Sequence, residues 1–408
     1  MTLDAAAIRS DFPVLEREVN GRPLVFLDSA ASSQKPRQVV EAMSEYYYRH
    51  HANVHRGAHV LSVEATALYE EARAAVAAFV GADPSGLVFV RNATEAVNLV
   101  AASWGRTHLE AGDEVVVSVA EHHANIVPWQ MVAAETGAVV RPVGIDGAGR
   151  IDLGALRDAL SPRTRLVATF HVSNVLGSVN PVAEVAELAH AAGALLFVDG
   201  AQAAPHLPVD VAALGCDFYA FSAHKMLGPT GIGALWARPE LLAGMPPYMG
   251  GGEMISRVTF EGTTFAPPPK RFEAGTPSIA EAVGFAAAVR YLEAVGMDAV
   301  RRHDEALVAR ALERLRGMPG VTLVGPEEGR VGLVTFVVDG VHAHDVATAL
   351  DLHGVAVRAG QHCAQPLHRE LGIAASTRAS FYLYNEPAEV DAFADALAAV
   401  LAHFAAFA

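Results

Sequence analysis

A lysine just after an apolar segment is the residue of this chain best placed to do chemistry. The segment 218–221 (Phe-Tyr-Ala-Phe) predicts a buried strand, and Lys225 follows it shortly before a Gly-Pro turn at residues 228–229. Burying an amine is costly unless another group engages it. A Schiff base with an aldehyde cofactor would engage the Lys225 amine, and pyridoxal 5'-phosphate (PLP) is the usual cofactor of this kind.

An acidic residue occupies the matching position on the preceding apolar segment. Asp199 ends the segment 195–198 and comes 26 residues before Lys225 (225 − 199 = 26). PLP enzymes pair a carboxylate with the pyridine nitrogen, because a protonated ring is a better electron sink. Asp199 could instead cap the next helix. The order of the two residues, each at the end of a predicted strand, favours a PLP site.

Three polar residues could hold the phosphate of such a cofactor. Thr94 stands between the apolar segment 87–90 and a helix predicted to begin near Glu95. A helix N-terminus with a nearby hydroxyl is a good anion site, although an ordinary helix cap would look the same. Ser222 and His224, which flank the lysine turn, could supply further donors to the phosphate.

A pair of histidines, His122 and His123, follows the apolar segment 114–118. Paired histidines can bind a metal ion, but we find no other His or Cys pair with ligand spacing to complete such a site. Stacking of an imidazole on a cofactor ring, together with proton transfer, fits this position better.

Cys363 is the candidate nucleophile. A free cysteine is more often a small buried apolar residue, but this one lies in a loop of Gly, Gln, His and Pro residues beside Arg358 and His362. Nearby cations favour the attacking thiolate. Cys216, the other cysteine, adjoins an apolar strand and has no basic neighbour, so we predict that it belongs to the core. Arg378 could clamp a substrate carboxylate with two parallel hydrogen bonds, or form a structural ion pair.

Seven short apolar segments alternate with helix-length segments and must position these residues. They are 87–90, 114–118, 139–143, 166–170, 195–198, 218–221 and 233–237. This alternation predicts a largely parallel sheet with helices on both faces, in which ligands bind at the carboxyl ends of the strands. The candidate residues Thr94, Asp199, Ser222 and Lys225 all fall at such ends.

The remainder of the chain predicts a smaller second domain. A Pro-rich stretch, 259–270, is predicted to be irregular, and a long helical zone, 278–318, follows it and leads into the second domain. In that domain we predict strands at 321–324, 331–338 and 355–358 and a helix at 344–353. We expect an N-terminal segment 1–25 near the small domain, a large cofactor-binding domain 26–295, and a small domain 296–408 that carries the Cys363 loop.

Composition narrows the class of protein. With 52% hydrophobic and 18% charged residues, the 408-residue chain has the make-up of a compact enzyme rather than a disordered protein. A net charge of −15 disfavours binding to nucleic acid or to anionic membranes. No segment predicts a membrane span, since even the most apolar run, 392–407, predicts an amphipathic terminal helix. The N-terminus lacks signal-peptide features, and two cysteines suit a reducing cytoplasm.

The motifs taken together resemble the SufS-type (group II) cysteine desulfurases, fold-type-I PLP enzymes of the class-V aminotransferase family. The resemblance runs through residues 27–32, 55–57, 121–125, 172–177, 199–202, 222–225, 271–276 and 358–363. It implies an α/β fold, with a mostly parallel seven-stranded sheet in the large domain and a smaller α+β C-terminal domain. It also implies a cytoplasmic homodimer.

The resemblance further implies roles for individual residues. Lys225 would hold PLP, Asp199 would pair with its ring nitrogen, Gln202 would bond the ring hydroxyl, and His122 would stack on the ring. The phosphate would be held by Thr94, Ser222 and His224, with Thr276 reaching in from a second subunit. The substrate would be bound by Asn174, Arg358 and Arg378, and Cys363 would take its sulfur.

The implied reaction converts L-cysteine to L-alanine and passes sulfur, through a persulfide on Cys363, to a SufU- or SufE-type acceptor for iron–sulfur cluster assembly. The segment 341–345 resembles the docking segment for a SufU-type acceptor. Gln361 departs from the family pattern, which has a second histidine there, and this departure puts a proton-relay role of the position in question. Other PLP lyases or transferases need no loop cysteine. Selenocysteine lyase, acting on selenocysteine with less help from the thiol, is the alternative.

Overall fold

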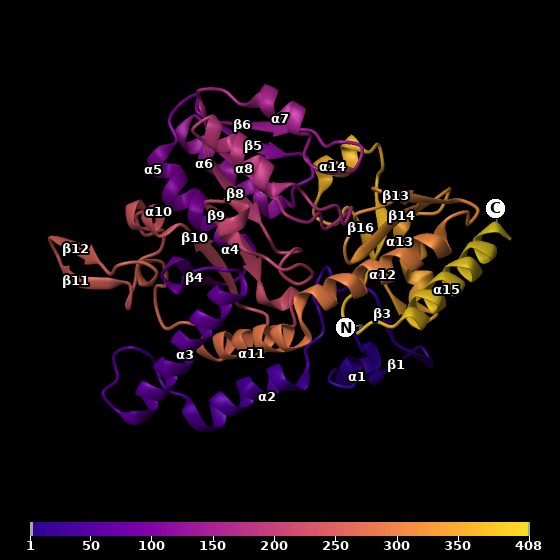
Figure 1. Cartoon of the computed structure of the whole chain (residues 1–408), viewed down its shortest axis with the longest axis horizontal. Helices are drawn as coiled ribbons and strands as arrows, with labels where there is room; N and C mark the ends of the chain where they lie inside the picture. The colour runs from indigo at the N-terminus through magenta and orange to yellow at the C-terminus, as the bar shows by residue number, and fades with distance from the viewer. Residues whose placement is uncertain (1–2, 407–408) are drawn as a thin grey trace.

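A seven-stranded sheet forms the centre of the larger part of the molecule in the computed structural model, which describes residues 3–406 (Figure 1). Its strands are β4 (Leu87–Val90), β5 (Glu114–Ser118), β6 (Val139–Val143), β7 (Thr164–Phe170), β8 (Leu195–Asp199), β9 (Phe218–Ser222) and β10 (Gly233–Ala237). The spatial order is β4-β10-β9-β8-β7-β5-β6, and β10 runs antiparallel to both of its neighbours while the other pairs are parallel. The prediction of a mostly parallel seven-stranded sheet is confirmed.

Both faces of this sheet are covered by helices, as its continuously apolar strands require. Alternate residues of β4 show the two faces, because Leu87 and Phe89 belong to one core cluster and Val88 and Val90 to another. The first cluster includes α3 (Val60–Phe79), α8 (Val182–Ala191) and α11 (Ile279–Val295), and the second includes α4 (Ala93–Val100) and α6 (Val127–Thr136). The remaining helices of this part are short: α5 (Arg106–His108), α7 (Leu153–Ala159), α9 (Val211–Leu214) and α10 (Pro239–Gly244).

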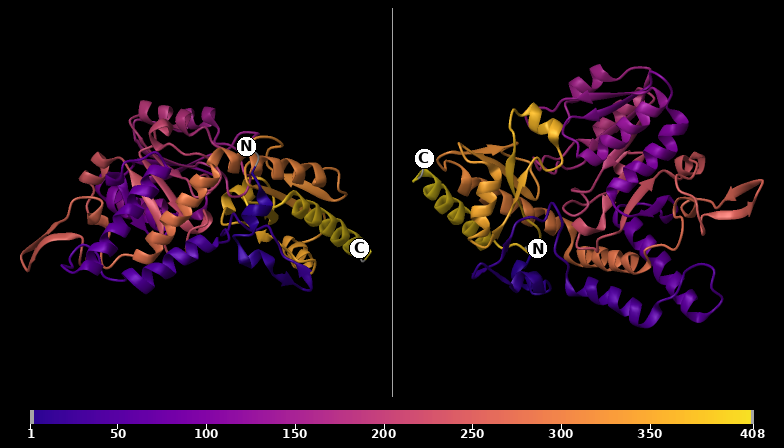
Figure 2. Two further views of the ribbon diagram at one scale, coloured as in Figure 1. Left: turned by 60° about the horizontal axis from the view of Figure 1, so that its bottom comes forward. Right: turned by 180° about the vertical axis from the view of Figure 1, so that it is seen from behind.

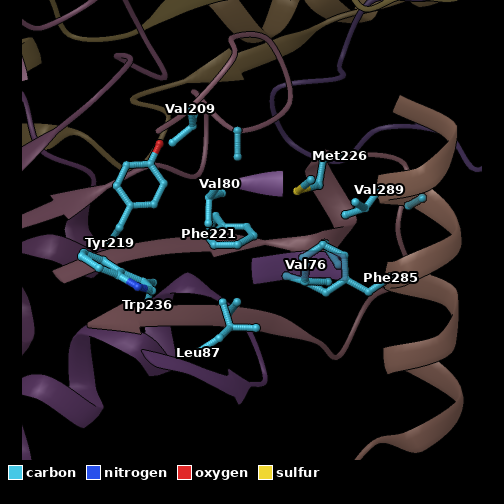
Figure 3. Close-up of a cluster of buried hydrophobic side chains, with 14 of the residues drawn as sticks. Val76, Val80, Leu87, Val209, Tyr219, Phe221, Met226, Trp236, Phe285 and Val289 are labelled. Atoms are coloured by element: carbon cyan, nitrogen blue, oxygen red, sulfur yellow. The ribbon is translucent and has the colours of Figure 1, made fainter. Parts of the chain in front are cut away.

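Aromatic side chains fill the core between the sheet and α11 (Figure 3). Phe221 of β9 meets Phe285 of α11 edge to face, with 5.9 Å between the ring centroids, and both are fully buried. Met226, one residue after Lys225, is fully buried in the same cluster. The packing of α11 therefore supports the turn that carries Lys225.

A second, four-stranded sheet lies toward the C-terminus (Figures 1 and 2). Its order is β13 (Val321–Val324), β14 (Leu333–Val338), β17 (Ser376–Ser380) and β16 (Arg358–Gly360). It is accompanied by α12 (Met297–Leu315), α13 (Ala343–Asp351), α14 (Gln365–Glu370) and α15 (Pro387–Ala405). The predicted terminal helix corresponds to α15, and residue 407 of that prediction lies outside the described residues. The domain boundaries stay a prediction.

The N-terminal segment lies beside this second sheet (Figure 2). It contains α1 (Ala5–Arg9), β1 (Glu18–Val19), β2 (Arg22–Pro23) and β3 (Val25–Phe26), and is followed by α2 (Arg37–Glu45). Strand β3 pairs in parallel with β15 (Val355–Ala356), and Arg9 forms an ion pair of 3.0 Å with Glu389 of α15.

No described helix is long and apolar enough to cross a membrane.

Three sequence predictions differ from the observed elements. The strand predicted at 355–358 is divided between β15 and β16, which belong to different sheets. The helical zone breaks at Gly296, whose φ of 87° ends α11 before α12 begins. The stretch 259–270, predicted to be irregular, includes β12 (Gly262–Phe265), which forms a hairpin with β11 (Ile255–Thr259) that projects from the body (Figure 1). The hairpin residues are mostly exposed, so no apolar pattern marks it.

We expect Phe285→Ala to lower the free energy of unfolding by about 3–5 kcal/mol, because the truncation leaves a cavity beside Phe221. Chemical denaturation followed by circular dichroism measures this change. Phe260, at the tip of the projecting hairpin, is fully exposed, and Phe260→Ala serves as the matched control. A change of less than about 0.5 kcal/mol is expected for the control. Equal effects of the two substitutions would contradict this account of the core.

Candidate active site

A single pocket collects nearly all the residues that the sequence singles out. It has a volume of about 480 Å³ and lies at the carboxyl ends of the strands of the large sheet, where the β16–α14 loop meets them. Its lining includes Thr94, His122, Asn174, Asp199, Gln202, Ser222, His224, Lys225, Arg358, Cys363 and Arg378. Residues from both sheets therefore converge on one cavity.

Lys225 lies on a 3₁₀ turn (Ala223–Lys225) directly after β9. Burial lowers the pKa of its amine from the ordinary 10.5 to about 8, although the nearby Asp199 carboxylate acts in the opposite direction. An amine with a pKa this low is partly unprotonated at neutral pH and can act as a nucleophile. The environment of Lys225 therefore suits a covalent bond to an aldehyde.

Asp199 ends β8, next to β9, and its side chain is buried. One of its oxygens accepts a hydrogen bond of 2.9 Å from the amide of Ala201. Burial raises the pKa of this carboxyl, while the Ala201 amide and the charge of Lys225 lower it. A cation brought against Asp199 would offset the cost of burying its charge. The site thus offers a carboxylate to a protonated ring nitrogen, which is what PLP requires.

The segment after Asp199 depends on a glycine. A Cβ at Gly200 would lie 2.1 Å from the ring of Tyr219 on the neighbouring strand, so no larger residue fits without displacing that ring. This close packing sets the course of the chain toward Gln202, whose side chain lines the pocket and donates a hydrogen bond of 2.7 Å to the carbonyl of Ala30.

The phosphate end of the pocket lies where α4 begins. Asn92 caps this helix, and the hydroxyl of Ser222 accepts a hydrogen bond of 2.9 Å from the amide of Ala93. A Cβ at Gly233 would lie 2.6 Å from the Phe221 carbonyl oxygen and 2.8 Å from Cα of Asn92, so the helix start approaches the sheet only because this residue is glycine. Thr94 lines the pocket at this helix N-terminus, which suits an anion.

Two histidines of the pocket are neutral at physiological pH. Burial, with a smaller contribution from the charge of Lys225, lowers the pKa of His122 to about 3 and that of His224 to about 4. Nδ1 of His122 accepts a hydrogen bond of 3.0 Å from the amide of Ala124, so the ring proton is assigned to Nε2. A neutral imidazole with a protonated Nε2 can stack on a ring and exchange a proton. Together with Lys225, Asp199 and the start of α4, it fits PLP.

The Cys363 loop is held in a strained backbone conformation beside this pocket. His362 and Cys363 have φ values of 49° and 55°, in the left-handed region that L residues seldom adopt. Two hydrogen bonds from the pocket offset the strain: Asn174 Nδ2 donates to the His362 carbonyl at 2.7 Å, and the His123 amide donates to the Cys363 carbonyl at 2.8 Å. The Cys363 residue remains exposed.

Two further loop side chains form hydrogen bonds with the segment 374–376. The side-chain amide of Gln361 donates to the carbonyl of Ala374 at 3.1 Å. Nε2 of His362 lies 3.1 Å from the Ser376 hydroxyl, and burial lowers the pKa of His362 to about 2. Cys216 is the contrast that the sequence predicts: it is buried in the core, and burial raises the pKa of its thiol.

Arg378 is the most deeply buried cation of the pocket. Its Nη1 donates to the Asn174 carbonyl at 2.7 Å, and its Nε is buried without a hydrogen-bond partner. Burial lowers the pKa of Arg378 to about 10, but the group stays charged at neutral pH. A buried guanidinium with an unused donor suits a substrate carboxylate.

Thr276 is the one predicted site residue that the structure does not bring into the pocket. It lies in a separate hollow with Arg91, Glu95 and Tyr248. The prediction that it reaches the phosphate of a second subunit is not tested by a single chain. Among residues 3–406, no group of three or more His, Cys, Asp or Glu side chains is placed to hold a metal ion.

Sequence reasoning missed the role of the segment that precedes α2. Asp28 contacts both Arg358 and Arg378, and Lys35 donates to the His224 carbonyl at 2.9 Å, beneath the lysine turn. The available signal was the motif 27–32, one of those that carry the resemblance, which includes Asp28.

Comparisons with known proteins agree with this geometry. The family model described as aminotransferase class-V matches residues 25–393. A probable cysteine desulfurase of Halobacterium salinarum is 53% identical over 398 residues, which cover 97% of this chain and 96% of the relative. The solved structure of the cysteine desulfurase CsdA of Escherichia coli has a TM-score of 0.91 at 41% identity, covering 98% and 99% of the two chains. An apo cysteine desulfurase of Thermococcus onnurineus NA1 has a TM-score of 0.93 at 40% identity, covering 99% of each chain.

We expect the aldehyde reactivity of Lys225 to rise through a midpoint near pH 8, because only the unprotonated amine attacks and burial lowers its pKa to about 8. The measurement treats cofactor-free protein briefly with PLP at a series of pH values, traps the product with borohydride and quantifies the labelled peptides. The three lysines are Lys35, Lys225 and Lys270, and the exposed Lys270 is the internal control. Identical pH profiles for Lys225 and Lys270 would contradict this description of the pocket.

Proposed function

The chain belongs to the class-V aminotransferase family and, within it, to the PLP-dependent cysteine desulfurases. We propose that it converts L-cysteine to L-alanine and takes the sulfur onto Cys363 as a persulfide. The observation that carries the proposal is the position of Cys363. Its residue is exposed, yet it lines the same pocket as Lys225 and Asp199. A nucleophilic sulfur therefore faces a site built for PLP.

PLP supplies an electron sink that loosens the bonds around the substrate Cα and, through them, the Cβ–S bond. Lys225 holds the cofactor and, when its amine is free, moves the proton of the substrate Cα. Its pKa of about 8 suits both tasks near neutral pH. Asp199 keeps the ring nitrogen protonated, Gln202 bonds the ring hydroxyl, and His122 stacks on the ring and excludes water from that face.

The phosphate is held, in this proposal, by Thr94 at the start of α4 and by Ser222 and His224 of the lysine turn. The protein acts as a homodimer in which Thr276 completes the phosphate site of the partner copy. The location of Thr276 outside its own pocket supports this arrangement, since the residue has no phosphate to reach within one chain.

Arg378 and Asn174 bind the substrate carboxylate and orient the thiol toward Cys363. The Cys363 sulfur then attacks the substrate sulfur. An S–S bond forms as the Cβ–S bond breaks, the electron pair goes to Cβ, and a proton completes the methyl group of alanine. The sulfur is oxidised to the persulfide level while Cβ is reduced, so the reaction needs no external oxidant.

The persulfide passes to a SufU- or SufE-type acceptor in the cytoplasm for iron–sulfur cluster assembly. The segment 341–345 is the proposed docking point. His342 and His344 stack there with 5.3 Å between the ring centroids at the start of α13, and His344 lines a shallow hollow that also includes Arg358. The docking segment is thus on the surface close to the Cys363 loop.

We expect Cys363→Ala to retain binding of L-cysteine but to lose nearly all alanine formation, because only the attack on sulfur needs this thiol. The wild-type protein, treated briefly with L-cysteine and digested without reductant, should show one added sulfur atom on the Cys363 peptide by mass spectrometry. Cys216→Ala, which removes the buried thiol, is the control and should form both alanine and the persulfide.

Substantial alanine formation by Cys363→Ala would refute the role of this residue. Alanine without sulfur on Cys363 in the wild-type protein would favour direct elimination, as in a selenocysteine lyase. No alanine at all would refute the proposed substrate.

A further inference from the structure

One wall of the pocket presents two arginines that share a single carboxylate. Arg358 donates to Asp28 from Nε at 3.1 and 3.2 Å and from Nη2 at 2.9 Å. Nη2 of Arg378 lies 3.5 Å from the other side of this carboxylate. Both arginines line the pocket, whereas Asp28 lines a separate shallow hollow beside α13, which Arg358 also lines. Asp28 therefore neutralises one of the two positive charges from outside the pocket.

The two arginines differ in the donors that they offer to a substrate. Arg378 is 2% exposed and keeps an Nε without a partner. Arg358 has a half-exposed side chain, and its contacts with Asp28 use the Nε–Nη2 edge, the edge with which a guanidinium clamps a carboxylate. An incoming carboxylate thus finds donors on Arg378, while the matching edge of Arg358 is already occupied.

Arg358 and Cys363 line the same pocket. If Cys363 takes sulfur from the substrate, the substrate side chain must lie between this thiol and the cofactor, within the field of Arg358. A guanidinium without a counter-charge at this place would attract anionic side chains. The thiol of L-cysteine, with an ordinary pKa of about 8.5, is mostly neutral at pH 7 and gains little from such a charge.

We infer that Asp28 is a specificity-determining residue, which occupies Arg358 and thereby favours amino acids with an uncharged side chain over those with an anionic one. This inference rests on the proposed function and adds the charge class of its substrate. Asp28 is a positioning residue: it touches no reacting atom and acts through the two arginines. A merely structural ion pair would leave the choice between substrates unchanged.

The test compares the binding of L-aspartate, whose side chain is anionic, with that of L-alanine, whose side chain is neutral. The change in cofactor absorbance of the PLP-loaded protein on adding each amino acid gives both dissociation constants without turnover. Asp28→Asn keeps the shape of the side chain and removes its charge. We expect Asp28→Asn to lower the dissociation constant of aspartate relative to that of alanine by about tenfold, as for one unmasked charge near the surface.

Three further variants separate charge from structure. Asp28→Glu should keep the wild-type ratio, and Asp28→Asn combined with Arg358→Gln should restore it, because the unmasked charge is then gone. Arg358→Gln alone should weaken aspartate relative to alanine, and this test remains if Asp28→Asn does not fold. Asp146→Asn, which breaks the surface ion pair with Arg150, is the matched control and should leave the ratio unchanged.

An unchanged ratio in Asp28→Asn, or a shift that persists in the double variant, would overturn the inference. So would tighter relative binding of aspartate by Arg358→Gln. Because binding is measured without desulfuration, the result for Asp28 does not depend on whether the proposed desulfurase reaction takes place. A protein that shows these ratios but makes no persulfide refutes the proposed function and leaves the role of Asp28 standing.

Discussion

The site depends on a lysine and an aspartate that are both shielded from water at neighbouring strand ends. Burial lowers the pKa of Lys225 to about 8 and raises that of Asp199, and each charge partly compensates the other. The parallel pairing of β8 with β9, in which Asp199 lies opposite Ala220, brings the two strand ends to the same edge of the sheet. A surface lysine in the same chain position would stay protonated and hydrated, so the reactivity of Lys225 is a consequence of the sheet and its helical cover.

The lysine turn is held from below by the segment 28–35. The His224 carbonyl accepts hydrogen bonds from the Ser33 amide at 3.0 Å and from Lys35 at 2.9 Å, and the Ser33 hydroxyl accepts from the amide of Leu227 at 2.9 Å. Leu227 has a φ of 67°, an unfavourable value for leucine that these contacts help to maintain. The same segment reaches the C-terminal part of the chain through a hydrogen bond of 2.8 Å between Ser29 and Tyr384.

The loop from the second sheet meets the pocket through hydrogen bonds to its backbone carbonyls and through apolar packing of Ala364 and Leu367 against Phe170 and Val175. The His362 and Cys363 carbonyls accept from Asn174 and His123, residues of the large-sheet part. The strained backbone at His362 and Cys363 is thus maintained by contacts from the other side of the cavity. The position of the sulfur consequently depends on how the two sheets are arranged, and a change at Asn174, which holds the His362 carbonyl, would act on Cys363 without touching it.

Local residue patterns are enough to predict the strands of the large sheet and the residues at their ends. Continuous apolar segments identify strands buried on both faces, and parallel strands place their carboxyl ends at one edge, so Lys225, Asp199, Thr94 and Ser222 could be assigned together. Strand β17 carries Arg378 in the polar run Ser-Thr-Arg-Ala-Ser, which shows no apolar pattern. The folded chain alone reveals that Asp28 lies 2.9 Å from Arg358, 330 residues away, and that Thr276 lies outside the pocket. Such contacts join segments that are distant in the chain, and local residue patterns do not encode which distant segments meet.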